Sequence, residues 1–148
     1  MLGDSLLVAP VFKASGEVEY YLPEGKWINI LTGDVKEGGS WQKEKHDYFS
    51  LPLMLRPNSI LATGACDCKP DYEFAEGVKL CISEMTDGCT AETAVTDLRG
   101  KAVLHASAER QGDIIRLRVE SSTNWCYALL GDQNLTVITE QQTPGTEK

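Results

Sequence analysis

The second half of the chain alternates apolar and polar residues with a period of two. Two segments show this most clearly, and their apolar residues are Val78, Leu80 and Ile82 in the first and Ile115, Leu117 and Val119 in the second. The positions between them are mostly charged. Successive side chains of a β-strand point to opposite faces of a sheet, so both segments are predicted to be strands with one buried and one wet face.

Shorter segments of β-favouring or apolar residues predict more strands. They lie at residues 4–11, 35–37, 41–43, within 51–57 and at 60–62, and later at 91–96, 102–109, 125–130 and 135–139. The polar segment 43–47 is interpreted as a surface loop. Turn sequences rich in Gly and Asp separate the later strands, and no window shows the stripe of an amphipathic helix. The predicted fold class is therefore all-β.

Residues 19–33 carry the strongest local signal. A Tyr-rich run ends at Pro23-Glu24-Gly25, and a second run follows through Trp27 and Ile28 to Thr32-Gly33. Proline fixes one turn dihedral and glycine accepts a positive one, so the two runs are predicted to form a β-hairpin. We expect Tyr21 and Trp27 to be buried in it.

Residues 63–70 break the strand pattern, since they combine Gly64, two cysteines and Pro70. Such a change of composition is typical of a domain boundary. The sequence therefore predicts two small antiparallel β-sandwich domains, at residues 1–66 and 67–148.

The chain of 148 residues carries a formal net charge of −8, from 14 basic and 22 acidic residues. It has no basic stripe for a phosphate backbone, so nucleic acid is not expected as a partner. It also has no apolar run of about eighteen residues, and its start lacks the features of a signal peptide. We therefore expect a cytoplasmic protein that does not span a membrane.

Five cysteines occur, and Cys66-x-Cys68 is the only close pair. A zinc site would need Cys-x-x-Cys spacing with a second pair or histidines nearby, and a disulfide-rich scaffold would be shorter and denser in cysteine. Reduced thiols are the favoured interpretation, and metal binding and a disulfide remain open as alternatives.

The letters Gly3-Asp4-Ser5-Leu6 resemble the nucleophile block of a lipase and esterase family. A serine nucleophile needs a histidine base that a carboxylate orients, and this family supplies them as Asp-x-x-His. Neither His46 nor His105 follows an aspartate at that spacing. The letters are therefore interpreted as the start of a buried strand.

Three other kinds of site can be considered from single residues. A glycosidase needs two opposed carboxyl groups, but most acidic residues here belong to predicted turns. Exposed aromatic rings could bind sugar by stacking, and the candidates are Trp41, Tyr72 and Trp125. The turn acids Asp87 and Asp97 could bind calcium, but their spacing fits no calcium loop and solvated turns are favoured.

Several motifs together resemble glycoside hydrolase family 31, in its α-xylosidase branch. They are Tyr21-Leu22-Pro23-x-Gly25-x-Trp27 with the flanking segments 1–11, 51–53 and 56–61, and then Pro70-Asp71-Tyr72, Asp87-Gly88 and Asn124-Trp125. In that family these motifs follow the catalytic barrel, in proximal and distal C-terminal β-domains. Members often continue further, so the resemblance leaves open that the second domain lacks terminal strands.

The resemblance implies that the catalytic aspartates lie on a barrel that this sequence does not contain. We therefore assign no catalytic, substrate-binding or metal-binding residue and no cofactor. The implied role is a non-catalytic C-terminal fragment of a retaining α-xylosidase, or alternatively of an α-glucosidase, whose partner is the barrel. A carbohydrate-binding module that takes oligosaccharides is the second hypothesis. The apolar run Leu6 to Val11 and the prolines around Leu53 would face the barrel, so self-association of the separate chain is expected.

Overall fold

The computed structural model describes residues 1–69, 71–131 and 133–142, and in this part of the chain every regular element is a β-strand. The first six strands are β1 (Leu6–Val8), β2 (Glu17–Leu22), β3 (Lys26–Asn29), β4 (Val35–Glu37), β5 (Ser40–Lys45) and β6 (Leu53–Leu55). The others are β7 (Ile60–Thr63), β8 (Val78–Ile82), β9 (Thr90–Thr96), β10 (Ala102–Gln111), β11 (Ile114–Ser121), β12 (Trp125–Leu129) and β13 (Thr136–Gln142). The predicted all-β class is confirmed. No helix that could cross a membrane occurs among the described residues.

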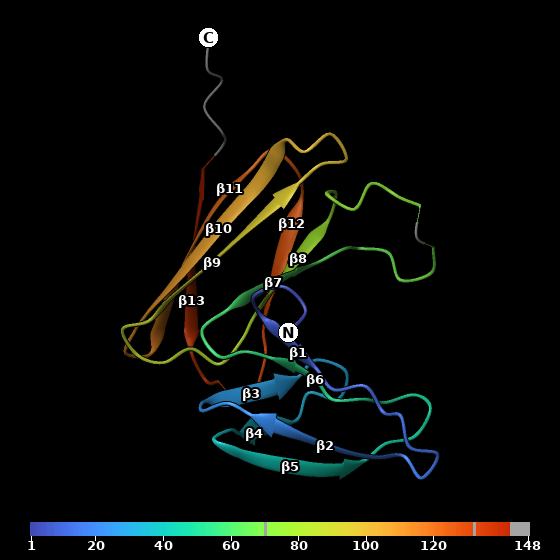
Figure 1. The fold of residues 1–148 in the computed structure, drawn as a ribbon. Helices are drawn as coiled ribbons and strands as arrows, with labels where there is room; N and C mark the ends of the chain where they lie inside the picture. The colour runs from blue at the N-terminus through green and yellow to red at the C-terminus, as the bar shows by residue number, and fades with distance from the viewer. Residues whose placement is uncertain (70, 132, 143–148) are drawn as a thin grey trace.

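The strands form two β-sandwiches, which lie one above the other in Figure 1. In the first, the sheet β1-β6-β3-β4 packs with the two-stranded sheet β2-β5. In the second, the sheet β13-β11-β10-β9 packs with β12-β8-β7. Each sandwich has its own apolar core, since one cluster of buried residues includes Leu22, Trp27 and Met54 and the other includes Leu80, Leu104 and Leu117.

The predicted hairpin at residues 19–33 is wrong in its pairing. Strand β2 pairs with β5, whereas β3 pairs with β4 and β6 in the opposite sheet. The bend at Pro23-Glu24-Gly25 therefore takes the chain from one sheet to the other instead of joining two neighbours. Leu22 and Trp27, on either side of this bend, are 0% and 2% exposed because each points from its own sheet into the shared core.

A second connection crosses between the same two sheets beside the first. Gly38 and Gly39, which join β4 to β5, donate backbone hydrogen bonds to the carbonyls of Gly25 (2.8 Å) and Leu22 (2.7 Å). The two connections approach so closely that a Cβ atom on Gly38 would lie 1.6 Å from the carbonyl oxygen of Pro23. Only glycine fits this position, because no side chain atom has room there.

Two edge strands of the second sandwich pair in parallel, unlike the antiparallel pairing of the others. Strand β12 runs parallel to β8, and β13 runs parallel to β11. After β11 the chain crosses to the opposite sheet as β12 and then returns as β13. Parallel neighbours need a crossover connection, which β12 supplies between β11 and β13, and strands β9 to β11 supply between β8 and β12.

Strand β7 belongs to the second sandwich, although the predicted boundary at residue 66 assigns it to the first domain. It pairs with β8 from Ile60↔Ile82 to Thr63↔Lys79, and Ile60 is part of the second core. The boundary itself stays a prediction, as does incompleteness of the second domain at its end, where residues 143–148 lie outside the described part of the chain.

Candidate functional site

The residues of the esterase-like motif do not form a catalytic triad in the described part of the chain. Ser5 lies in the turn before β1, where its carbonyl accepts a hydrogen bond from the N–H of Arg56 at 2.8 Å. His46 bonds to Glu44 and Ser50 in the first sandwich. His105 is exposed on β10 of the second sandwich, opposite Glu120.

A groove of about 560 Å³ between the two sandwiches is large enough for a sugar. Four carboxylates line it, those of Glu24, Glu37, Glu84 and Asp87. Three of the four residues are exposed to water, whereas a glycosidase general acid needs surroundings that disfavour its charged form. Asp87 also accepts a hydrogen bond from the N–H of Gly112 at 2.7 Å, which gives it a role in turn structure. The groove therefore lacks the features of a hydrolytic centre.

The three candidate stacking aromatics lie in different surroundings. Trp41 on β5 is 68% exposed, while Trp125 is half-buried against the second core and Tyr72 is half-buried beside Gly64. Tyr21, which we predicted to be buried, is 48% exposed and forms an edge-to-face pair with Trp41, at 5.9 Å between ring centroids. Trp27 is buried as predicted, and its indole N–H donates to the Pro23 carbonyl at 2.8 Å.

The candidate calcium acids serve as turn residues. Asp97 accepts hydrogen bonds from the N–H groups of Arg99 and Lys101, both at 2.9 Å. Asp87 accepts the hydrogen bond from the N–H of Gly112. Among residues 1–69, 71–131 and 133–142, no group of three potential metal ligands comes together.

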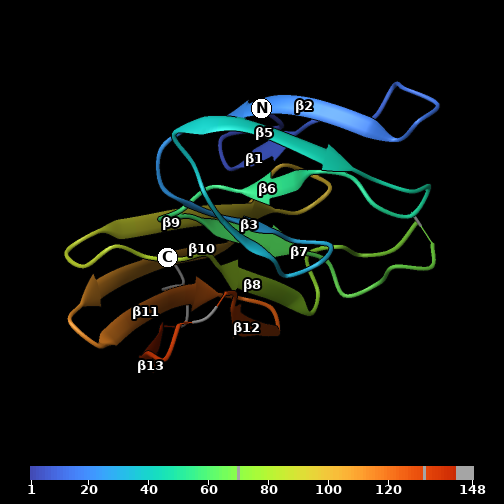
Figure 2. The ribbon, with the colours of Figure 1, turned by 90° about the horizontal axis from the view of Figure 1, so that it is seen from below.

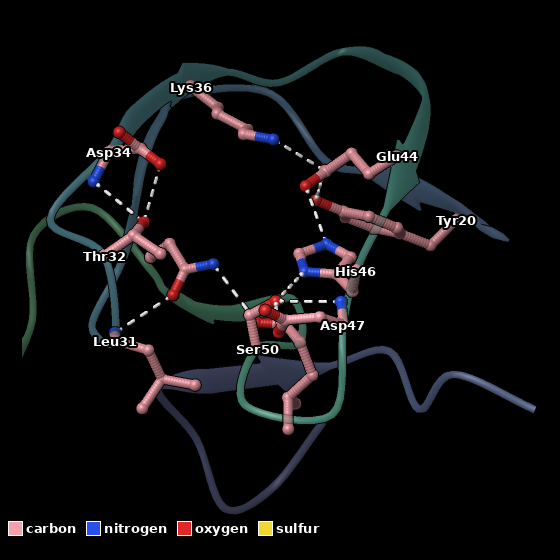
Figure 3. Close-up of polar contacts among 11 residues, drawn as sticks. Tyr20, Leu31, Thr32, Asp34, Lys36, Glu44, His46, Asp47 and Ser50 are labelled. Carbon is pink, nitrogen blue, oxygen red and sulfur yellow. Dashed lines mark hydrogen bonds and ion pairs between the residues drawn. The ribbon is translucent and has the colours of Figure 1, made fainter. Parts of the chain in front are cut away.

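A partly buried polar cluster in the first sandwich was missed by sequence reasoning. The segment 43–47, interpreted as a surface loop, continues strand β5 as far as Lys45, and Glu44 points inward from it. Lys36 of β4 reaches the Glu44 carboxylate at 2.6 Å, and the Tyr20 hydroxyl of β2 donates to the same oxygen. His46 binds the other oxygen through Nε2 at 3.1 Å, so three side chains converge on one carboxylate (Figure 3).

The surroundings of Glu44 set the charge state of the cluster. Burial raises the pKa of the Glu44 carboxyl, but the hydrogen bonds from Lys36, Tyr20 and His46 outweigh it and leave the pKa below its ordinary value. Burial and the bond to Glu44 raise the pKa of Tyr20 well above its ordinary range. Glu44 is therefore a carboxylate and Tyr20 a neutral donor of the same β2-β5 sheet, and the contact of Glu44 with Lys36 on β4 joins this sheet to the opposite one at neutral pH.

The same cluster fixes the loop that follows β5. His46 Nδ1 lies 3.1 Å from the hydroxyl of Ser50, and this hydroxyl donates to Asp47 at 2.9 Å. The N–H of Phe49 also donates to Asp47 at 2.9 Å, and these bonds lower the pKa of the Asp47 carboxyl. The contacts close a tight turn, whose residues Asp47 and Ser50 lie below His46 in Figure 3. Tyr48 and Phe49, which this turn carries, are exposed to solvent.

A second loop lies against this one and adds a third exposed ring. The N–H of His46 donates to the Gly16 carbonyl at 2.9 Å, which holds loop 9–16 beside loop 46–52. Phe12, Tyr48 and Phe49 are all at least 90% exposed. We call the two loops, with Phe12, Tyr48 and Phe49, the aromatic end of the first sandwich. Three fully exposed rings on ordered loops are typical of an interaction surface.

Two family descriptions match the chain. Residues 1–61 match "Glycosyl hydrolase family 31 C-terminal domain", and residues 73–148, just over half of the chain, match "Alpha-xylosidase YicI, C-terminal domain".

Individual relatives agree with these matches. The chain is 29% identical over 140 residues to α-xylosidase XylQ of Lactiplantibacillus pentosus, covering 93% of this chain and 18% of that protein. It is 24% identical over 143 residues to α-glucosidase 2 of Bacillus thermoamyloliquefaciens, covering 96% and 16%. Its fold resembles the crystal structure of the family 31 α-xylosidase of Xanthomonas citri, with a TM-score of 0.66 and 20% identity over 90% of this chain and 16% of that one.

The chain thus spans less than a fifth of the length of each of these proteins. The motifs in its sequence, its two sandwiches and both matched segments agree with one another. The chain belongs to glycoside hydrolase family 31, and its two sandwiches correspond to C-terminal domains of that family.

Proposed function

We propose that the chain is a non-catalytic part of a retaining α-glycosidase that acts on α-xylosyl oligosaccharides in carbohydrate metabolism, and that it supports the catalytic barrel of that enzyme. Its relatives are five or more times longer, which leaves ample polypeptide for a barrel. The carboxylates gathered in the groove between the two sandwiches are mostly solvated and suit turns rather than hydrolysis. All five cysteines are free thiols, which supports a cytoplasmic enzyme.

An α-xylosidase is favoured over an α-glucosidase as the parent activity. The match to the α-xylosidase C-terminal domain covers all of the second sandwich from β8 onward. The identity to the Lactiplantibacillus pentosus α-xylosidase, 29%, also exceeds the 24% identity to the Bacillus thermoamyloliquefaciens α-glucosidase over a similar length.

The proposal that this chain supports the catalytic barrel rests mainly on the aromatic end. Burying a fully solvated Phe or Tyr ring is favourable, by about 25 cal/mol for each Å² of apolar area removed from water. The aromatic end holds three such rings on loops that the Glu44 cluster and the Gly16 contact keep in place. Ordered loops lose little conformational entropy on binding, so this surface is prepared for a protein partner. We assign the barrel as that partner.

The experiment replaces the three rings together, as Phe12→Ser, Tyr48→Ser and Phe49→Ser. The isolated wild-type chain is expected to bind an apolar dye and to self-associate at high concentration, because the aromatic end has no partner. The triple variant is expected to lose most of the dye fluorescence and to sediment as a monomer. Adding the barrel segment, expressed separately, is expected to remove the dye signal of the wild type.

A matched control is Leu98→Ser, which removes another exposed apolar side chain, 73% exposed, from a turn of the second sandwich. It is expected to change neither dye binding nor sedimentation. The purified wild-type chain is also expected to leave p-nitrophenyl α-xyloside and α-glucoside intact. Measurable hydrolysis, or a triple variant that behaves like the wild type, would contradict the proposal.

A carbohydrate-binding module is the second candidate, and the Tyr21–Trp41 pair is the observation that favours it. Both rings stand on the outer face of the β2-β5 sheet, beside the cross-strand pair of Glu19 and Lys43. Exposed rings with charged neighbours can stack on a sugar and hydrogen-bond its hydroxyls. This arrangement supports binding of an oligosaccharide without implying its hydrolysis.

Titration with xyloglucan fragments separates the two candidates. Of the three tryptophans, Trp41 alone is largely exposed, so a saturable fluorescence change that Trp41→Ala abolishes would establish binding there. Trp125→Ala serves as the control, because this ring packs against the second core. If the fragments leave the fluorescence unchanged, carbohydrate binding by this pair is excluded.

A further inference from the structure

Two cysteine thiols face each other on the segment that joins β7 to β8. The sulfur atoms of Cys66 and Cys68 lie 3.5 Å apart, Cys66 is half-buried and Cys68 is exposed. A disulfide bond is about 2.05 Å long, so the two atoms need to approach by only about 1.5 Å. The part of this segment at residues 64–69, green in Figure 1, extends from the sheets and carries no strand ladder that would resist such a movement.

The two thiols differ in their surroundings. Hydrogen bonds from the backbone N–H of Cys68, from the Cys68 thiol and from the backbone N–H of Lys69 lower the pKa of the Cys66 thiol. A thiol with a lowered pKa holds more of the thiolate, which is the nucleophile in exchange reactions. Cys66 is therefore suited to attack first, and Cys68 to resolve the product.

We propose that Cys66 and Cys68 form a reversible dithiol–disulfide site that reacts with small-molecule disulfides such as oxidised glutathione. In the first step the Cys66 thiolate attacks one sulfur of the small disulfide, whose S–S bond breaks and releases one thiolate. In the second step the Cys68 thiolate attacks the Cys66 sulfur and releases the other. The two cysteines lose two electrons and two protons in total, and the small disulfide is reduced to two thiols.

The rest of the chain favours disulfide formation at Cys66 and Cys68 over metal binding there and over reaction at the other three cysteines. A metal ion would need further ligands, and the described residues offer no group of three His, Cys, Asp or Glu side chains that could hold one. Cys81 is buried in β8, Cys89 is half-buried, and Cys126 is exposed on β12 without the close thiol contact of Cys66 and Cys68. A single exposed thiol can form a mixed disulfide but has no neighbour to resolve it.

The test is a reaction of the folded chain with oxidised glutathione, followed by acid quenching, alkylation of the remaining thiols and tryptic mass spectrometry. Trypsin does not cleave before proline, so Arg56-Pro57 and Lys69-Pro70 stay intact and residues 46–79 form one peptide. This peptide holds Cys66 and Cys68 alone, while Cys81 and Cys89 share the next peptide and Cys126 lies in a third. Each kind of thiol is therefore read separately in one experiment.

The wild-type peptide 46–79 is expected to lose two hydrogen atoms and to carry no glutathione, and a reducing agent should restore it. In Cys68→Ser, the same peptide should retain one glutathionyl group, because the resolving thiol is absent. That adduct should form faster than the adduct at Cys126, because the hydrogen bonds to the Cys66 sulfur increase its thiolate fraction. A glutathionyl group that persists on the wild-type peptide, or equal rates at Cys66 and Cys126, would overturn the proposal.

Discussion

Replacing Gly38 with alanine is expected to destabilise the chain by about 3 kcal/mol, the upper range for overpacking a filled site. The added Cβ would lie 1.6 Å from the Pro23 carbonyl oxygen and 2.7 Å from its carbon, both of which are backbone atoms. The Pro23 carbonyl cannot move alone, because it accepts the hydrogen bond of the buried Trp27 indole. The two connections between the sheets would have to separate, and urea unfolding followed by circular dichroism measures the cost.

Gly64→Ala is the matched control for this prediction. A Cβ there would lie 1.8 Å from a neighbouring atom, but that atom is the hydroxyl oxygen of Tyr72, at the far end of a side chain that can rotate. The expected loss is below about 1 kcal/mol, since a side chain relaxes more cheaply than backbone. Equal losses in the two variants would show that the crossing connections are not rigid and would contradict the proposed reason.

Local sequence patterns predicted the strands well because alternation is set within a few residues. Strands β8 and β11 occur where apolar and polar positions alternate, and their apolar residues point inward. The predicted wet face of β8 is wrong at Cys81, which is buried. The same rule could have corrected the expectation for Tyr21. Val18, Tyr20 and Leu22 alternate with Glu17 and Glu19, which places Tyr21 on the face of the two glutamates, where it is found.

Strand pairing could not be predicted from the same local patterns. The sequence Pro23-Glu24-Gly25 permits a tight hairpin and also a bend from sheet to sheet, because both need a restricted dihedral and a permissive one. The choice depends on whether Leu22 and Trp27 can be buried together, and this depends on strands β5 and β6, far along the chain. The parallel pairs of β12 and β13 likewise depend on which sheet each strand joins.

The Glu44 cluster escaped detection because a charged segment usually lies in water. Lys43, Glu44 and Lys45 are adjacent in the sequence, yet β5 turns only Glu44 inward. Its partners come from three other places, Lys36 on β4, Tyr20 on β2 and His46 after β5. A partly buried charge that is stabilised by donors from several elements is visible only when the fold brings these donors together.

The second large effect is expected from Glu44→Ala, a loss of about 3 kcal/mol at neutral pH. The substitution leaves the Lys36 ammonium and the Tyr20 hydroxyl without their acceptor, and both lie in or near the interior. Glu17→Ala is the matched control, because it breaks a surface pair with Lys13 at 3.9 Å. Exposed pairs contribute little, so the control should change stability by less than about 0.5 kcal/mol.

The pH dependence of that loss identifies its cause as the charge of Glu44. The folded chain lowers the pKa of this carboxyl, so the cluster adds stability above the unfolded pKa of about 4.3 and loses it as the pH falls through the folded value. The stability difference between wild type and Glu44→Ala should therefore shrink as the pH falls from about 6 to below about 4.3. Urea unfolding of both proteins across this range measures it, and taking the difference cancels the titration of the other carboxylates. If the difference stays constant into acid, packing of the Glu44 side chain, and not its charge, holds the two sheets together at this point.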